Sequence, residues 1–352
     1  MGGSRCCPTR RGTLLAFAAF LASAGASFAA PSKPPVPVGV AWPDLSEARW
    51  ADDEAAIRGA IEKAGGAYIT ADAKGSPATQ AAQIGDLAAG GAKAIIIVSP
   101  DGEALLDAAR KAAANGTGVI AYDRLIDTPG ILSIAYDGAA AGRLLAKALL
   151  AAKPAGAYAF IRGPKGDLNS DLINAGVMEA LKPAVAAGKV KMAETAFVDG
   201  WKAAGAMNAM QTLFSKTGGK IDAVVAESDA MAGGVAAALA SQGVSGAIAM
   251  GGVGGGHEAA NRIALGTETV SVWEDGQALG DAAGKAAVAL ADGKKPREVA
   301  GAKPLPGGKG EAVLLDPLAI TRGNLGALVD HGGMTKAQIC NGVAPKTTPF
   351  CG

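Results

Sequence analysis

The stretch Gly90–Asp101, GGAKAIIIVSPD, decides the fold together with Val119–Arg124, VIAYDR, which follows it in the chain. The two runs contain predicted strands at Ala94–Val98 and Val119–Tyr122, and a helical pattern lies between them at Glu103–Ala114. Because the strands are apolar at successive positions, both of their faces are expected to be buried. Such strands alternating with helices are typical of a parallel sheet covered by helices on both sides, so the stretch predicts an α/β fold.

The same alternation extends from this stretch toward both ends of the chain. On the N-terminal side it predicts strands at Val36–Ala41 and Ala67–Ala71 and helices at Glu47–Ala64 and Ala78–Ala89. On the C-terminal side it predicts a helix at Asp171–Leu181 and strands at Ala157–Ile161, Lys189–Ala193, Ala223–Ala226, Ala247–Met250 and Thr269–Val272. These strands are too many for one ordinary sheet. The sequence therefore predicts two Rossmann-like lobes with parallel central sheets.

A second copy of the opening pattern supports two similar lobes. Gly218–Asp229, GGKIDAVVAESD, also has a Gly-Gly turn, an apolar strand and a Ser and an Asp at the strand's end. Ordinary α/β periodicity would give a similar repeat, so both interpretations stay open.

The first 29 residues read as a secretory signal peptide. Arg5, Arg10 and Arg11 precede a short apolar run, Leu14–Leu21, and small residues follow it. The run is shorter than the roughly 20 apolar residues of a membrane span. We expect cleavage after Ala29, with Ala26 and an uncleaved anchor as alternatives. The mature chain is long enough for two domains and has no further candidate span, so a periplasmic location is predicted.

The charged residues, the histidines and the cysteines limit the partners, ligands and cross-links that the chain can have. The chain has 33 basic and 32 acidic side chains, which favours neither nucleic acid nor an anionic membrane as a partner. It has two histidines, His257 and His331, without the spacing of metal ligands, so no metal and no cofactor are expected. Cys340 and Cys351 lie in a turn-rich tail, where an oxidising compartment favours a disulfide over free thiols.

The strand ends point to a small-molecule site. In open α/β sheets, ligands bind beyond the carboxyl ends of the strands. Carboxylates and guanidinium groups bind neighbouring hydroxyls, and aromatic rings pack on the apolar faces of sugars. We therefore predict that a small polar ligand, a sugar, binds there. The candidate residues by position are Trp42, Asp123, Arg124, Asn169, Trp201, Ser228, Asp229, Trp273 and Glu274.

Several motifs in a fixed order suggest a family. They are DL…RW at Asp44–Trp50, VIAYDR at Val119–Arg124, VDGW at Val198–Trp201, IDAVVA with DA-AGG at Ile221–Gly234, and RIALGTETVSV at Arg262–Val272. From about Pro37 to Gln338 the sequence resembles the type I periplasmic sugar-binding proteins, most closely their D-xylose-binding branch. The resemblance implies a ligand held between two lobes and delivery to an ABC permease or a chemoreceptor.

The resemblance also implies a hinge of three crossings and the order of the domains. We expect the crossings near Ala135–Asp137, Asp275–Gly276 and Ala302–Pro304. The N-terminal lobe would then consist of residues 36–136 and 276–302, and the C-terminal lobe of residues 137–275 and 303–338. Residues 339–352 would form a disulfide-closed tail, and we expect a monomer.

Residue by residue, the resemblance implies ligand contacts from both lobes. Arg49 and Trp50 would contribute from the first loop, Asp123 and Arg124 would clamp the sugar hydroxyls, Asn169 would face the ligand from the other lobe, and Trp201 would stack on it. A purely structural role stays open for Arg49–Trp50, for Asp123–Arg124 and for Trp201. Asp123–Arg124 also fits a surface ion pair, and the tryptophans also fit plain core packing. Trp42 has no clear counterpart in the family.

The second lobe departs from the family pattern. Ser228 stands where the family has Asn, Val253 and Gly254 replace a Gln-Asp pair, and Glu274, after Trp273, replaces a Lys. We hypothesise that Glu274, with Glu227 or Asp275 as helpers, supplies the carboxylate missing at 254. The ligand would then be a bulkier sugar, a cyclitol or a cationic compound rather than free xylose.

Other functions compete with sugar transport. A dinucleotide enzyme is disfavoured because GGVGGG breaks the G-x-G-x-x-G pattern at His257, and no P-loop or G-x-S-x-G elbow is present. We therefore expect no enzyme. A sensor that reports to a receptor, and a binding protein for a non-sugar ligand, both remain alternatives.

Overall fold

The structure is a computed structural model that describes residues 1–2, 34–46, 48–99, 105–305, 308–345 and 347–352. The side chains of residues 48 and 49 are also outside the description. The predicted signal peptide therefore lies almost wholly outside the described residues. Among the described residues, every helix is too short or too polar to span a membrane.

The first lobe is built on a sheet of seven strands in the order β11-β12-β5-β4-β3-β1-β2. All neighbours are parallel except β11 and β12. The strands are β1 (Val36–Trp42), β2 (Gly66–Asp72), β3 (Ala94–Val98), β4 (Gly118–Tyr122), β5 (Ile131–Tyr136), β11 (Lys303–Pro304) and β12 (Glu311–Leu315). The first four lie within one residue of their predicted bounds, whereas β5 and β11–β12 are absent from the predicted set.

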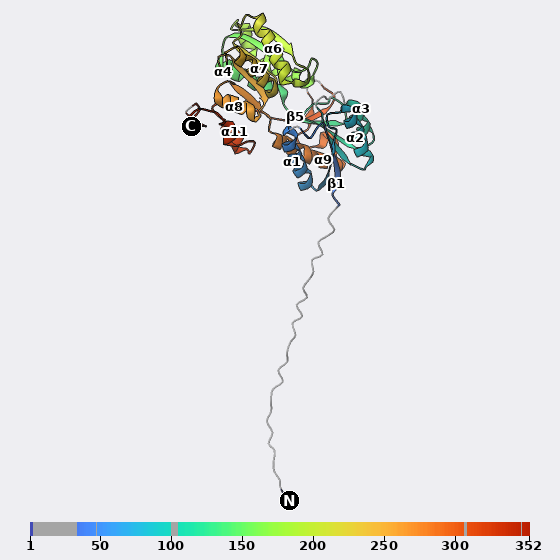
Figure 1. Cartoon of the computed structure of the whole chain (residues 1–352). Helices are drawn as coiled ribbons and strands as arrows, with labels where there is room; N and C mark the ends of the chain where they lie inside the picture. Colours follow the sequence, from blue (N-terminus) through green and yellow to red (C-terminus); the bar gives the residue numbers. More distant parts are fainter. Residues whose placement is uncertain (3–33, 47, 100–104, 306–307, 346) are drawn as a thin grey trace. The chain divides into compact units, whose positions relative to one another are not determined.

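Helices cover both faces of this sheet, as the apolar strands predict. On one face α1 (Ala48–Lys63) and α9 (Gly276–Ala291) pack on alternate side chains of β1 and β3, such as Val40 and Ile96. On the other face α2 (Pro77–Ala89) and α3 (Leu106–Ala114) cover Ile95 and Ile97. Figure 1 shows α1 next to α9, and α2 next to α3.

Two glycines allow α9 to approach α1 closely. A Cβ at Gly280 would lie 2.6 Å from the Cβ of Ala56, and one at Gly284 would lie 2.6 Å from that of Ala60. These helices are more than 200 residues apart in the sequence, and their contact joins residues 276–291 to the first lobe.

The second lobe is built on a sheet of six strands in the order β13-β10-β9-β8-β6-β7, in which only β13 is antiparallel to its neighbour. The strands are β6 (Gly156–Arg162), β7 (Val190–Phe197), β8 (Ala223–Ala226), β9 (Ala249–Gly254), β10 (Val270–Trp273) and β13 (Leu318–Thr321). Helices α4 (Gly138–Ala152) and α5 (Leu168–Ala186) cover one face, and α6 (Ala203–Lys216) and α7 (Asp229–Ser241) cover the other.

The chain passes between the two sheets at three places. It leaves the first sheet after Tyr136, returns after Trp273, and leaves again after Leu315. The expected third crossing at Ala302–Pro304 is wrong, because β12 pairs with β5 along its whole length. Ala312 of β12 is buried with Leu125 and Leu305, and this apolar contact keeps β11 and β12 in the first lobe.

The tail packs on the second lobe beside α8 (His257–Leu265). The predicted disulfide between Cys340 and Cys351 is present. It follows two short helices, α10 (Gly326–Asp330) and α11 (Lys336–Ile339), whose apolar residues bury against Ile263 and Trp273. The side-chain amide of Asn261 donates to the backbone oxygens of Ile339 and Asn341, each at 2.8 Å. These contacts bind the tail to α8 at several points.

Candidate functional site

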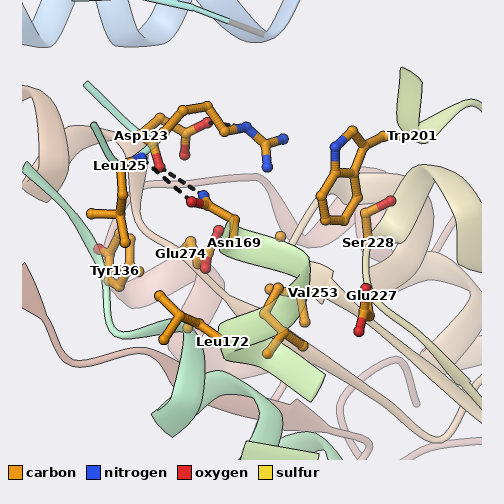
Figure 2. Close-up of a pocket in the computed structure, with 14 residues that line it drawn as sticks. Asp123, Leu125, Tyr136, Asn169, Leu172, Trp201, Glu227, Ser228, Val253 and Glu274 are labelled. Carbon is orange, nitrogen blue, oxygen red and sulfur yellow. Dashed lines mark hydrogen bonds and ion pairs between the residues drawn. The ribbon is translucent and has the colours of Figure 1, made fainter. Parts of the chain in front are cut away.

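A cavity of about 80 Å³ lies where the carboxyl ends of strands from both sheets come together. It is lined from the first sheet by the loop after β4 and by the end of β5. From the second sheet it is lined by the start of α5, by η1 (Asp199–Trp201), and by the ends of β8, β9 and β10. The polar lining residues are Asp123, Arg124, Tyr136, Asn169, Trp201, Glu227, Ser228 and Glu274 (Figure 2).

Asp123 and Arg124 enter the cavity from the first lobe. Asp123 has a left-handed backbone, with a φ of 68°, which Asp tolerates better than most residues. Its backbone N–H still bonds to the carbonyl of Ile134 at 2.9 Å. The Asp123 Oδ2 and Arg124 Nε atoms are 3.7 Å apart, and the two side chains are only 12% and 19% exposed. The pair is therefore part of the cavity and not an ordinary surface ion pair.

Asn169 connects the second lobe to that loop. Asp167 caps α5 by accepting a hydrogen bond from the Ser170 N–H at 2.9 Å, which places Asn169 in the first turn of the helix. The Asn169 amide donates to the carbonyl of Asp123 at 3.1 Å and accepts from the N–H of Leu125 at 3.3 Å (Figure 2). Both hydrogen bonds join the two lobes at the wall of the cavity.

Trp201 forms an aromatic wall on the side of the second lobe. It has a φ of 59°, and its ring packs so closely on Gly163 that a Cβ there would lie 2.4 Å from Cζ2. The guanidinium of Arg124 lies 4.6 Å from the centre of the ring, a cation–π distance. The indole Nε1–H is buried and has no hydrogen-bond partner among the residues that the structure describes. A ligand acceptor would satisfy this donor.

Glu227 is a buried carboxylate at the end of β8, with its side chain 1% exposed. Its Oε2 accepts from the Gly163 N–H at 2.8 Å and from the Ser170 hydroxyl, and its Oε1 accepts from Arg162 Nε at 3.2 Å. Burial raises the pKa of Glu227 to about 7, although these three donors act in the opposite direction. The sequence suggests this residue only as a helper, since a Glu after a strand is a common pattern.

Tyr136 and Ser228 complete the lining with groups that are already bonded. The Tyr136 hydroxyl donates to the carbonyl of Asp275 at 3.0 Å, so it links the first crossing to the second, and burial raises the pKa of Tyr136 above its usual value. The Ser228 hydroxyl caps α7 by accepting from the Met231 N–H at 3.3 Å. Tyr136 was missed because β5 itself was not predicted.

Two tryptophans predicted near the ligand belong to the core of the first lobe. Trp42 is fully buried, donates its Nε1–H to the Tyr68 hydroxyl at 3.2 Å, and lies outside the cavity lining. Trp50 is 5% exposed, and its ring centre is 6.1 Å from that of Trp42. The structure thus favours core packing for both residues. The side chain of Arg49 lies outside the described residues.

Asp229 and Trp273 also lie outside the cavity lining. Their side chains instead contact the loop that follows β9. The Asp229 carboxylate accepts from the Ser271 hydroxyl at 2.7 Å and from the Gly256 N–H at 2.8 Å. Trp273 is 8% exposed, packs against Gly255, and meets His331 of the tail edge-on at 5.3 Å between ring centres.

Gly254 explains one of the departures from the family pattern. Its φ is 140°, a conformation that residues with a side chain rarely adopt. A Cβ at this position would lie 3.3 Å from the Asp229 Oδ2 atom. An aspartate at 254 would therefore be strained and would face a second carboxylate.

A wider cleft of about 460 Å³ adjoins the cavity and shares Arg124, Leu125, Asn169 and Trp201 with it. Its further walls come from the loops after β4 and β6, including Thr128 and Lys165. The cavity and the cleft together offer room beyond one small ring.

Known proteins resemble this chain in sequence and in structure. A periplasmic binding protein domain matches residues 38–295. The chain is 34% identical over 306 residues to the D-xylose-binding periplasmic protein of Escherichia coli, covering 86% of this chain and 91% of that protein. The protein of the same description from Haemophilus influenzae is 33% identical over 308 residues, with the same coverage. The predicted resemblance to the D-xylose-binding branch is thereby confirmed.

Solved structures agree with these relatives. A carbohydrate transporter solute-binding protein from Chloroflexus aurantiacus, in complex with D-glucose, has a TM-score of 0.76 and 25% identity over 87% of this chain and 98% of its own. An ABC transporter solute-binding protein from Clostridium phytofermentans, with bound β-D-glucose, has a TM-score of 0.75 at the same identity over 86% of this chain and 99% of its own. The predicted two-lobed fold is confirmed, and these relatives are binding proteins rather than enzymes. This chain belongs to the periplasmic binding protein family.

Proposed function

We propose that this protein is the substrate-binding component of an ABC importer and that it holds a monosaccharide in the cavity between its lobes. The observation that carries the proposal is the convergence of Asp123, Arg124 and the Trp201 ring on one cavity. A carboxylate and a guanidinium bind neighbouring hydroxyls, and an indole packs on the apolar face of a sugar ring. The relatives from E. coli and H. influenzae support a pentose such as D-xylose.

The mechanism follows from two lobes that share one site. Ligand binds to one lobe, the other lobe closes over it, and the permease recognises the closed form. The Asn169 bridge to Asp123 and Leu125 belongs to the contacts that such closure uses. We propose a periplasmic, monomeric protein whose signal peptide is removed. A mature N-terminus at Ala30 in mass spectrometry of exported protein would support this processing.

A ligand larger than xylose is the second candidate, and the open space supports it. Gly254 adds no side chain to the cavity, and the adjoining cleft offers room for a substituent. A bulkier sugar or a cyclitol would use the same Asp123–Arg124 clamp.

Ligand binding is best tested by a thermal-shift screen of the mature protein, followed by calorimetric titration. The library would contain D-xylose, D-ribose, D-glucose, D-allose, myo-inositol, amino sugars and small cationic compounds. A ligand that binds only the folded state raises the melting temperature with its concentration. A saturable shift with a pentose or hexose is expected. A shift with cationic, non-sugar compounds alone would overturn the sugar assignment.

A further inference from the structure

We infer that Glu227 is the residue of the second lobe that accepts a hydrogen bond from a ligand hydroxyl, and that Arg162 and Ser170 are positioning residues that fix its carboxylate for this role. The inference rests on the proposed function and names the group that recognises the ligand from the side opposite Asp123 and Arg124. Gly254 leaves that side without the carboxylate that the family pattern places there.

The hydrogen bonds of Glu227 leave room for one more donor. Its Oε2 accepts two bonds, from the Gly163 N–H and the Ser170 hydroxyl, whereas its Oε1 accepts one bond, from Arg162. A carboxylate oxygen has two acceptor positions. The remaining position on Oε1 is therefore available to a hydroxyl in the cavity that Glu227 lines.

A complementary donor lines the same cavity. The Trp201 Nε1–H is buried without a partner among the described residues, and Gly163 contacts both the Trp201 ring and the Glu227 carboxylate. Figure 2 shows Trp201, Ser228 and Glu227 on one side of the cavity. A sugar hydroxyl can both donate and accept, so a polyol can pair with the Trp201 donor and with the remaining position on Glu227 Oε1. A ligand without hydroxyls cannot donate to that position on Glu227.

Arg162 favours the charged form of the Glu227 carboxylate and so acts against the effect of burial on its pKa. The Arg162 side chain is 13% exposed and lies between Glu227 and Asp171, to which it is bonded at 2.6 Å. Its guanidinium also lies 5.1 Å from the centre of the Phe197 ring. These three contacts hold the guanidinium beside Glu227, where it orients the carboxylate without itself lining the cavity.

The state of this carboxylate sets a pH dependence for binding. Burial raises the pKa of Glu227 to about 7, and a protonated carboxyl is a weaker acceptor. Sugar affinity is therefore expected to fall as the pH drops through 7. The charged groups around Glu227 are Arg162 of β6 and Asp171 of α5, with Asp123, Arg124 and Glu274 on the other walls of the cavity.

The experiment is a calorimetric titration with D-xylose and with D-glucose from pH 5.5 to 8.5, because neither sugar titrates in this range. For the wild type we expect the affinity to rise with pH around a midpoint near 7. Glu227→Gln should weaken binding about tenfold or more at pH 8.5 and remove the pH dependence. Ser170→Ala removes one donor to the carboxylate, so it should move the midpoint to higher pH while binding recovers at pH 8.5.

The matched control is Glu268→Gln. Glu268 is another buried glutamate of the second lobe, it is paired with Arg262 Nε at 2.7 Å, and burial raises its pKa to about 8. It does not line the cavity, so its substitution should keep the wild-type pH profile of binding.

Two outcomes distinguish a failure of the Glu227 inference from a failure of the proposed sugar binding. If the sugars bind and both Glu227→Gln and Ser170→Ala keep the wild-type pH profile, Glu227 is not the acceptor, even though the sugar site stands. If Glu227→Gln does not fold, Ser170→Ala still tests the inference, since it leaves the Glu227 carboxylate in place. If neither sugar binds the wild type at any pH, the sugar assignment fails and the inference fails with it.

Discussion

The two lobes contribute to the cavity in different ways. The first lobe contributes Asp123 and Arg124 from neighbouring positions after one strand, in the order that the family pattern predicts. The second lobe contributes Asn169, Trp201, Glu227 and Glu274 from four separate elements. The contrast teaches that one half of the site follows a short motif and the other half depends on how distant loops meet. It also suggests a common sugar clamp on one side and a ligand-specific wall on the other.

Arg124 offers the largest test of the contribution from the first lobe. Arg124→Ala should weaken sugar binding about 100-fold, because it removes a guanidinium and leaves the mostly buried Asp123 beside the ligand without that partner. Arg58→Ala is the control, since Arg58 also lies 4.6 Å from an aromatic ring, that of Tyr68, far from the cavity lining. Calorimetric titration measures both variants. Equal affinities in the two variants would remove Arg124 from the clamp.

Gly254 tests whether the cavity lining from the second lobe tolerates the aspartate of the family pattern. Gly254→Asp should lower the free energy of unfolding by about 2 kcal/mol, because of its positive φ and the nearby Asp229 carboxylate. We expect no gain in D-xylose affinity. Gly254→Ala shares the backbone strain without the charge, so urea denaturation of both variants separates the two causes. A large gain in pentose affinity for Gly254→Asp would contradict this account of the wall.

Trp201 separates stacking from hydrogen bonding on the same wall. Trp201→Phe keeps an aromatic ring but loses the Nε1 donor, so sugar affinity should fall about fivefold. Its counterpart in the first lobe is Trp42→Phe, which loses a bond to Tyr68 inside the core. That variant should lose stability in urea denaturation and keep its affinity. A loss of affinity in Trp42→Phe with none in Trp201→Phe would contradict the assignment of Trp201 to the site and of Trp42 to the core.

Ser228 provides the smallest and sharpest comparison. Asn and Ser cap helices equally well, so Ser228→Asn should leave the melting temperature almost unchanged. Because Asn is the residue of the family pattern, D-xylose affinity should change by less than about threefold if the wall has been rebuilt around other groups. A tenfold gain would show instead that position 228 still controls pentose binding.

Much of the fold follows from local patterns. The apolar runs at Ala94–Val98 and Ala223–Ala226 match β3 and β8 because strands buried on both faces leave a continuous signal. The residues of β12 are predicted in the wrong lobe, because the pairing of β12 with β5 joins residues about 180 positions apart. The local sequence pattern of a strand does not indicate which distant strand it pairs with.

The candidate site, like the fold, could be predicted from the sequence only in part. Asp123, Arg124, Asn169 and Trp201 follow recognisable motifs, and the structure places all four around one cavity. Trp42 and Trp273 are the last residues of β1 and β10, yet their rings are buried in the hydrophobic cores of the two lobes. The sequence indicates Glu227 only as a helper of Glu274, because the surroundings of its carboxylate depend on donors from β6 and α5.

The contact of α9 with α1 has a consequence for the order of folding. Residues 138–273 contain nearly all of the second sheet in one continuous segment. One face of the first sheet, in contrast, has only α1 of its two helices until residues 276–291 are synthesised. Strands β11 and β12, which extend this sheet beyond β5, come later still. During vectorial synthesis or export we therefore expect the middle of the chain to form its native core first. The lobe that begins at the N-terminus reaches its native state only when the last quarter of the chain arrives.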